Sequence, residues 1–222
     1  MTELHSIDNT KLYVSQIIDN LSDLAQYFEA ETEEVVNYAQ RHFRAKHRQN
    51  EWLTVRAMLR QALGPDVRID YDESGKPFLV SNSSLIVPSY NFLSISHSKT
   101  HAALLLSSQR NIGVDIEQIS PRVLRLAGRI AQPQELPADF QSFTPAQQAM
   151  VLTTIWTIKE AVYKSIDHQQ GFDLLTDVQV IPQQSFDLPA AIEVSVKKIL
   201  DKTRIHCSLY SDNIISVSSP EE

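Results

Sequence analysis

The chain has 222 residues, of which 42% are hydrophobic and 21% charged, with a net charge of −7 and a mean hydropathy of −0.22. No run reaches the roughly 18 apolar residues of a membrane-spanning helix, the N-terminus lacks a signal-peptide pattern, and the acidic balance disfavours general nucleic-acid binding. The single Cys207 excludes an internal disulfide and suits a reducing compartment. We therefore expect a cytoplasmic protein of one large domain or two small ones, without a membrane or nucleic-acid partner.

The first half of the chain predicts helices followed by strands. Apolar spacing predicts helices over residues 20–30 and 32–63, and the second is stopped by Gly64-Pro65. The length of this second helix makes a break near its basic stretch the expected arrangement. Alternating patterns and a turn at 72–77 then predict strands at 67–71, 78–80, 91–98 and 102–107.

The second half repeats this order. A strand is expected at 113–117 and helical structure at 121–130, followed by a loop rich in Pro and Gln (132–148) and a helix at 149–167. Further strands are expected at 178–181, 192–196, 205–210 and 214–217. The pattern predicts an α/β (α+β) fold of two structurally similar halves, residues 1–111 and 112–222, which form a pseudo-dimer.

One segment of the acidic chain is strongly basic. Residues 41–48 hold four fixed positive charges and two histidines. Such a local patch indicates a small anionic ligand or an acidic partner, and a solvated helix face is the alternative explanation.

Two acidic motifs carry the strongest chemical signal. Asp115 and Glu117 lie two apart in a β-branched stretch, so both carboxylates leave one face of a strand. Glu160 and Lys164 lie four apart and are neighbours on one helix face. Three carboxylates that converge beside lysines would form a hard-cation site for phosphates, suited to Mg²⁺ and also to Mn²⁺ or Ca²⁺. Each motif alone is more often a solvated strand end or a surface ion pair.

Two weaker motifs lie in the first half. Hydroxyls flank His97 in Ser96-His97-Ser98, a pattern suited to an anion, although a lone histidine is more often structural. The Gly75-Lys76-Pro77 turn could be only a turn, or its backbone and lysine could contact a ligand edge. No Gly-x-Ser-x-Gly, Walker or Gly-x-Gly-x-x-Gly motif occurs, which argues against a serine triad and ordinary nucleotide folds.

In this order and spacing the motifs resemble those of the Sfp-type 4′-phosphopantetheinyl transferase superfamily. The resemblance covers residues 44–171, and its last two motifs together are specific to the superfamily. The matching features are the basic helix that ends near Arg48, Gly75-Lys76-Pro77-Phe78, the segment 91–98, Gly113-Val114-Asp115-Ile116-Glu117, and the segment Trp156 to Lys164.

The resemblance implies an Mg²⁺-dependent enzyme, with Mn²⁺ as an alternative ion. It would transfer 4′-phosphopantetheine from coenzyme A to a serine of an acyl or peptidyl carrier protein and release 3′,5′-ADP. Asp115, Glu117 and Glu160 would hold the metal on the pyrophosphate. Glu160 would also be the base for the carrier serine, Lys164 would steady the developing charge, and Lys159 would lie close to the phosphates.

The resemblance also assigns the coenzyme A contacts to the N-terminal half and the metal and catalytic motifs to the C-terminal half of a monomer, with the active site in the cleft between them. Ser96 and His97 would contact phosphates, and His97 would reach the 3′-phosphate together with Arg48. The adenine would be framed by Gly75, Lys76 and Pro77.

Three other functions stay open on sequence alone. The chain could be a degenerate relative that binds coenzyme A or a carrier protein without turnover, a different Mg²⁺-dependent phosphotransferase, or an unrelated α/β protein with acidic surface decoration. The retention of Asp115, Glu117, Glu160 and Lys164 argues against the first. The sequence does not indicate which carrier protein or pathway is served.

Overall fold

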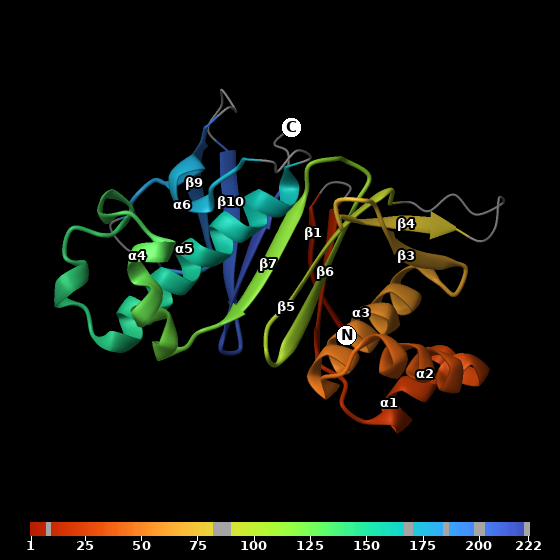
Figure 1. Ribbon diagram of the computed structural model, residues 1–222. Helices are drawn as coiled ribbons and strands as arrows, with labels where there is room; N and C mark the ends of the chain where they lie inside the picture. The colour runs from red at the N-terminus through yellow and green to blue at the C-terminus, as the bar shows by residue number, and fades with distance from the viewer. Residues whose placement is uncertain (8–9, 82–89, 167–170, 184–186, 198–202, 220–222) are drawn as a thin grey trace. The chain divides into compact units, whose positions relative to one another are not determined.

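In the computed structural model the chain forms two compact units, Met1–Gln109 and Arg110–Glu222 (Figure 1). The structure describes residues 1–7, 10–81, 90–166, 171–183, 187–197 and 203–219. Both units combine helices with antiparallel sheet, which confirms the predicted α/β class. Within the described ranges, no helix has the length and apolar character needed to cross a membrane.

The helices of the first unit are α1 (Leu21–Phe28), a 3-10 turn (Glu29–Glu31), α2 (Thr32–His42) and α3 (Lys46–Leu63). The expected break in the long helical segment occurs at residues 43–45, inside the basic stretch. Gly64 ends α3 with a φ of 85°, a left-handed conformation that glycine adopts without strain. A cluster that includes Leu24, Phe28 and Leu53 joins the three helices.

The sheet of the first unit has the order β1-β2-β6-β5, built from β1 (Thr2–Ile7), β2 (Thr10–Gln16), β5 (Phe92–His97) and β6 (His101–Ser107). A separate hairpin pairs β3 (Val67–Tyr71) with β4 (Pro77–Ser81). Helix α3 packs on the sheet through a core that includes Met58, Leu59 and Leu104. The first two strands were not predicted. Pairing of β2 with the fully buried β6 stabilises a segment whose own pattern is mixed.

The second unit has a five-stranded antiparallel sheet in the order β7-β11-β10-β9-β8. Its strands are β7 (Gly113–Gln118), β8 (Val178–Val180), β9 (Ala190–Val196), β10 (Thr203–Tyr210) and β11 (Asn213–Ser218). The helix α5 (Pro145–Ser165) packs against this sheet (Figure 1) and supplies Leu152, Ile155 and Ile158 to the core.

The segment between β7 and α5 is more ordered than the sequence predicts. A 3-10 helix (Pro121–Leu126) precedes α4 (Ala127–Ile130), and two 3-10 turns follow, Pro133–Glu135 and Phe140–Ser142. Helix α5 begins at Pro145 rather than at residue 149, because Thr144 and Gln147 form a capping box. After α5, a short α6 (Leu174–Asp177) leads into β8. Helix α5 ends at Ser165, followed by an extended Ile166, and so stops before the predicted end at residue 167, which itself lies outside the described residues.

Candidate functional site

A close contact between strand β7 and helix α5 positions the acidic motifs of the second unit. A Cβ atom added to Gly113 would lie 1.9 Å from the backbone oxygen of Ala161 and 2.9 Å from the backbone nitrogen of Ser165. Only glycine therefore allows the helix to approach the strand this closely. Since side chains alternate along a strand, Asp115 and Glu117 share with Gly113 the face that meets α5.

Asp115 and Lys164 form the central contact of this face. Lys164 Nζ donates to Asp115 Oδ1 at 2.7 Å and to the backbone oxygen of Val114 at 3.2 Å. The Asp115 side chain is only 5% exposed and that of Lys164 is 27% exposed. A charged carboxylate at this depth requires a compensating cation, and Lys164 provides it.

Glu117 and Glu160 both experience the charge of Asp115. The pKa of Glu117 is raised to about 7, mainly by burial and in addition by the Asp115 carboxylate, while a hydrogen bond from the Trp156 indole opposes the shift. Burial likewise raises the pKa of Glu160, with a further rise from Asp115 and a lowering by Lys164. The three predicted metal ligands are thus brought into one electrostatic environment, together with Lys164.

The composition of this group fits a hard divalent cation. Its donors are carboxylate oxygens, which Mg²⁺ prefers, and their mutual repulsion would be relieved by a cation. Over the part of the chain that is described, no three Asp, Glu, His or Cys side chains are already gathered as a complete metal site. In this structure Lys164 neutralises Asp115.

Lys159 is placed differently from the other predicted catalytic residues. Its side chain is 1% exposed, and its Nζ lies 2.8 Å from Glu135 Oε2, so the ammonium forms a buried ion pair. Burial lowers the pKa of Lys159, and the hydrogen bond to Glu135 opposes that shift. The structure does not bring Lys159 into the Asp115 group. The reason is helical geometry, because consecutive positions such as 159 and 160 point about 100° apart.

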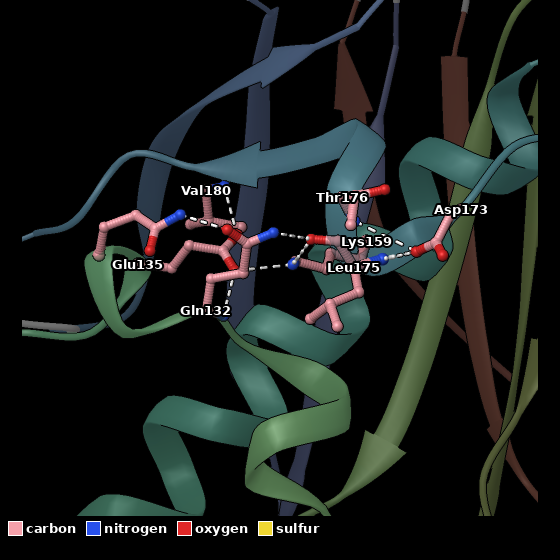
Figure 2. A network of polar contacts seen from close by, with 8 residues as sticks. Gln132, Glu135, Lys159, Asp173, Leu175, Thr176 and Val180 are labelled. Atoms are coloured by element: carbon pink, nitrogen blue, oxygen red, sulfur yellow. Dashed lines mark hydrogen bonds and ion pairs between the residues drawn. The ribbon is translucent and has the colours of Figure 1, made fainter.

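Glu135 is a polar residue of this unit to which sequence reasoning gave no role. Figure 2 shows that it joins several elements: Oε2 accepts from the backbone N–H of Gln132 at 2.7 Å, and Oε1 accepts from that of Val180 at 2.8 Å. Lys159 also lies 3.5 Å from the backbone oxygen of Leu175. The ion pair therefore connects α5 to the loop before it, to α6 and to β8.

In the first unit, the structure brings together the two side chains predicted to bind the 3′-phosphate. Arg48 at the start of α3 places Nη1 3.3 Å from His97 Nε2 at the end of β5. Glu51, which sequence reasoning missed, contacts both: its Oε2 accepts from Arg48 at 3.1 Å, and its Oε1 lies 3.6 Å from His97 Nδ1. The i,i+3 spacing of Arg48 and Glu51 is the only sequence signal for this group.

The remaining predicted residues of the first unit lie on strands and a hairpin turn. Ser96 is a buried residue of β5, one position before His97. Gly75 has a φ of 84° in the β3–β4 turn, where Asp72 accepts from the backbone N–H of Lys76 at 2.9 Å. A hydrogen bond from Ser74, followed by that from Lys76, lowers the pKa of Asp72. The turn that precedes Pro77 is thus held by its own side chains.

The fold and the Asp115–Lys164 group define the class as an α/β protein with an acidic site beside lysine in its second unit. Comparison with protein families identifies the class further, since residues 111–213 match the 4′-phosphopantetheinyl transferase superfamily. The chain is also 35% identical over 150 residues to the 4′-phosphopantetheinyl transferase AcpT of Salmonella typhimurium, covering 67% of this chain and 70% of that protein.

Two further relatives are similar over shorter stretches. The AcpT protein of Escherichia coli K12 is 37% identical over 119 residues, which cover 53% of this chain and 57% of that protein. The 4′-phosphopantetheinyl transferase of Bacillus subtilis is 30% identical over 115 residues, covering 50% and 48%. The chain belongs to the 4′-phosphopantetheinyl transferase superfamily and is an enzyme of this transferase type.

Proposed function

We propose that this enzyme transfers the 4′-phosphopantetheine group from coenzyme A to a serine of an acyl or peptidyl carrier protein, with Mg²⁺, and releases 3′,5′-ADP. The observation that carries the proposal is the contact of Asp115 with Lys164 on a strand and helix inside the family-matched region, with Glu117 and Glu160 beside them.

The second unit would supply the chemistry. Asp115, Glu117 and Glu160 would hold Mg²⁺ or Mn²⁺, and the bound ion would supply charge stabilisation for the pyrophosphate. The proposed base for the serine hydroxyl is Glu160, whose pKa is raised by burial, so its carboxylate is a stronger base than one in water. Lys164 would move from Asp115 toward the developing negative charge of the leaving phosphate.

Lys159 takes a different part in this proposal from the one expected on sequence. Because its ammonium is enclosed with Glu135, it would fix the orientation of α5 and hence of the adjacent Glu160, rather than contact a phosphate.

The first unit would bind coenzyme A. Arg48 together with His97 suits the 3′-phosphate, and Ser96 precedes His97 on the same strand. The β3–β4 turn, with Gly75, Lys76 and Pro77, would contact the adenine edge. The phosphate-binding residues and the β3–β4 turn would contact the same coenzyme A molecule. In this proposal the enzyme acts as a cytoplasmic monomer, and the single cysteine of its sequence suits a reducing compartment.

The direct test is the intact mass of an apo carrier protein after incubation with the enzyme, coenzyme A and Mg²⁺. The expected result is a gain of one phosphopantetheine on serine, together with release of 3′,5′-ADP, and loss of both with EDTA. No gain on several unrelated carriers, with coenzyme A still bound, would favour a binding protein instead.

A Glu160→Gln variant tests the assigned base. It should lower the transfer rate by about 10²-fold or more, because a positioned base contributes about 10²–10⁴-fold, while the melting temperature stays near that of the parent. The exposed Glu34 of α2 offers a charge-matched control, Glu34→Gln, which should keep full activity. Near-normal transfer by Glu160→Gln would contradict the assignment.

A further inference from the structure

A carboxylate to which the proposed transfer reaction gives no role, that of Glu51, contacts both Arg48 and His97 in the first unit. The Glu51 side chain is 11% exposed, whereas its partners Arg48 and His97 are 54% and 34% exposed. The carboxylate is therefore the covered member of the group, and the Arg48 guanidinium and the His97 imidazole are the members open to solvent. A ligand that arrives from solvent meets Arg48 and His97 before it meets Glu51.

The two contacts of His97 favour one tautomer of its ring. Arg48 Nη1 can only donate, so His97 Nε2, at 3.3 Å, accepts and carries no proton. The ring proton is then on Nδ1, which lies 3.6 Å from Glu51 Oε1. A phosphate oxygen can accept from His97 Nε2 only after that nitrogen is protonated, and both ring nitrogens then donate.

We propose that Glu51 is a positioning residue for recognition of the 3′-phosphate of coenzyme A. One oxygen holds the Arg48 guanidinium in place, and the other stabilises the imidazolium that His97 becomes when the phosphate binds. The proton is taken from solvent, and Arg48 exchanges its contact with Nε2 for one with the phosphate. This inference rests on the proposed coenzyme A site, and it assigns to Glu51 a role in selecting coenzyme A over dephospho-coenzyme A.

The negative charge of Glu51 also has an effect opposite to the proposed one, because it repels the phosphate. A carboxylate near a phosphate dianion weakens binding if it acts only through its charge. With Arg48 and an imidazolium beside it, however, the group carries one net positive charge, and the carboxylate is the member farthest from solvent. The two effects predict opposite signs for neutralisation of Glu51, so a Glu51→Gln variant separates them.

The experiment measures binding of coenzyme A and dephospho-coenzyme A by calorimetry, without metal or carrier protein. These ligands differ only in the 3′-phosphate. Glu51→Gln should weaken coenzyme A binding about tenfold, the scale of one lost hydrogen bond to a charged group, and change dephospho-coenzyme A binding less than about twofold. In the transfer assay, KM for coenzyme A should rise while kcat stays unchanged. The exposed Glu34→Gln variant should alter neither ligand.

Two further variants test whether Glu51 acts through its partners. Glu51→Asp keeps the charge but shortens the side chain, so its loss of coenzyme A affinity should be intermediate. This variant replaces Glu51→Gln in the binding experiment if Glu51→Gln does not fold. In a His97→Gln background, Glu51→Gln should have a much smaller effect, because residues that act as one unit are not additive.

Tighter coenzyme A binding by Glu51→Gln, or equal weakening of both ligands, would overturn the inference and leave the proposed transfer intact. If the parent enzyme itself shows no preference for coenzyme A over dephospho-coenzyme A, the subsite assignment and the inference fail together. If transfer is absent but the preference depends on Glu51, the inference holds and the proposed reaction does not.

Discussion

Lys164 neutralises the nearly buried carboxylate of Asp115. The charge of this carboxylate also raises the pKa values of Glu117 and Glu160. Lys164→Met should lower the melting temperature by several degrees, since loss of a partly buried ion pair costs about 1–2 kcal/mol, less than the roughly 3–5 kcal/mol of a fully buried pair. Added Mg²⁺ should stabilise this variant more than the parent, because the ion then replaces the positive charge that Lys164 places beside Asp115. Thermal melts with and without Mg²⁺ measure both effects.

The control for this variant is Lys197→Met. Lys197 is 64% exposed and lies 3.4 Å from Asp177, so its loss should change stability by less than about 1 kcal/mol. Equal Mg²⁺ shifts in the parent and in Lys164→Met would show that the ion does not bind beside Asp115.

Because Cys207 is buried, we expect the folded state to lose stability at alkaline pH. Burial in β10 raises the pKa of Cys207 from 9.0 to about 12, opposed by a hydrogen bond with Ser216. The folded state thus keeps this proton to higher pH than the unfolded state. Its contribution is complete below about pH 9 and is lost as pH rises toward 12, by up to about 1.4 kcal/mol per pH unit. Cys207→Ala should lose less stability than the parent between pH 8 and 10 in urea unfolding. Parallel losses would contradict this explanation.

At the scale of elements, the packing of α5 on β7 should depend on the absence of a side chain at Gly113. Gly113→Ala places a methyl group 1.9 Å from the backbone oxygen of Ala161, so strand or helix must move. We expect a loss of at least about 1–3 kcal/mol, the range for overpacking, and a parallel loss of transfer because Asp115 shifts relative to Lys164. Chemical unfolding and the carrier-mass assay measure the two losses.

The matched control is Gly128→Ala in α4. Gly128 is helical, and a Cβ added there meets no atom within 4 Å beyond its chain neighbours and its own helix backbone, so alanine should be neutral or slightly stabilising. A stable, fully active Gly113→Ala enzyme would show that the close approach of α5 is not required.

The sequence predicted elements where local patterns are strong. The break between α2 and α3, the strand β7 and most of α5 follow from periodicity and breakers. Strands β1 and β2 were missed because their stability comes from pairing with each other and with β6, about 90 residues away in sequence for the β2–β6 pair. The start of α5 was misplaced because a capping box outweighed the polar composition of the preceding loop.

The same distinction applies to the candidate site. Spacings of two and four place Asp115 and Glu117 on one face of a strand, and Glu160 and Lys164 on one face of a helix. The roles of Glu51 and Glu135 could not be predicted from such spacings, because each depends on a partner from another element, His97 and Lys159 respectively. Such pairs are set by packing between elements, which a local pattern does not encode.

At the scale of the whole molecule, the proposed ligand contacts are divided between the two units. Arg48 and His97 in the first would take the 3′-phosphate, and Asp115, Glu117 and Glu160 in the second would take the metal and pyrophosphate. The chain carries a net charge of −7, so binding of an anionic ligand depends on these local cations. Two groups that act on one ligand should be thermodynamically coupled.

Melting of the full chain tests this coupling through ligand stabilisation. A ligand that binds only the folded state stabilises it by RT ln(1 + [L]/Kd). Coenzyme A and Mg²⁺ together should therefore raise the melting temperature by more than the sum of their separate shifts. With 3′,5′-ADP, which lacks a pyrophosphate, Mg²⁺ should add much less. Arg48→Gln should reduce the shifts with both ligands in the absence of Mg²⁺, whereas Asp115→Asn should remove only the Mg²⁺-dependent part. An equal Mg²⁺ increment with both ligands would mean that the ion does not bind at the pyrophosphate, and the division of contacts between the units would have to be reassigned.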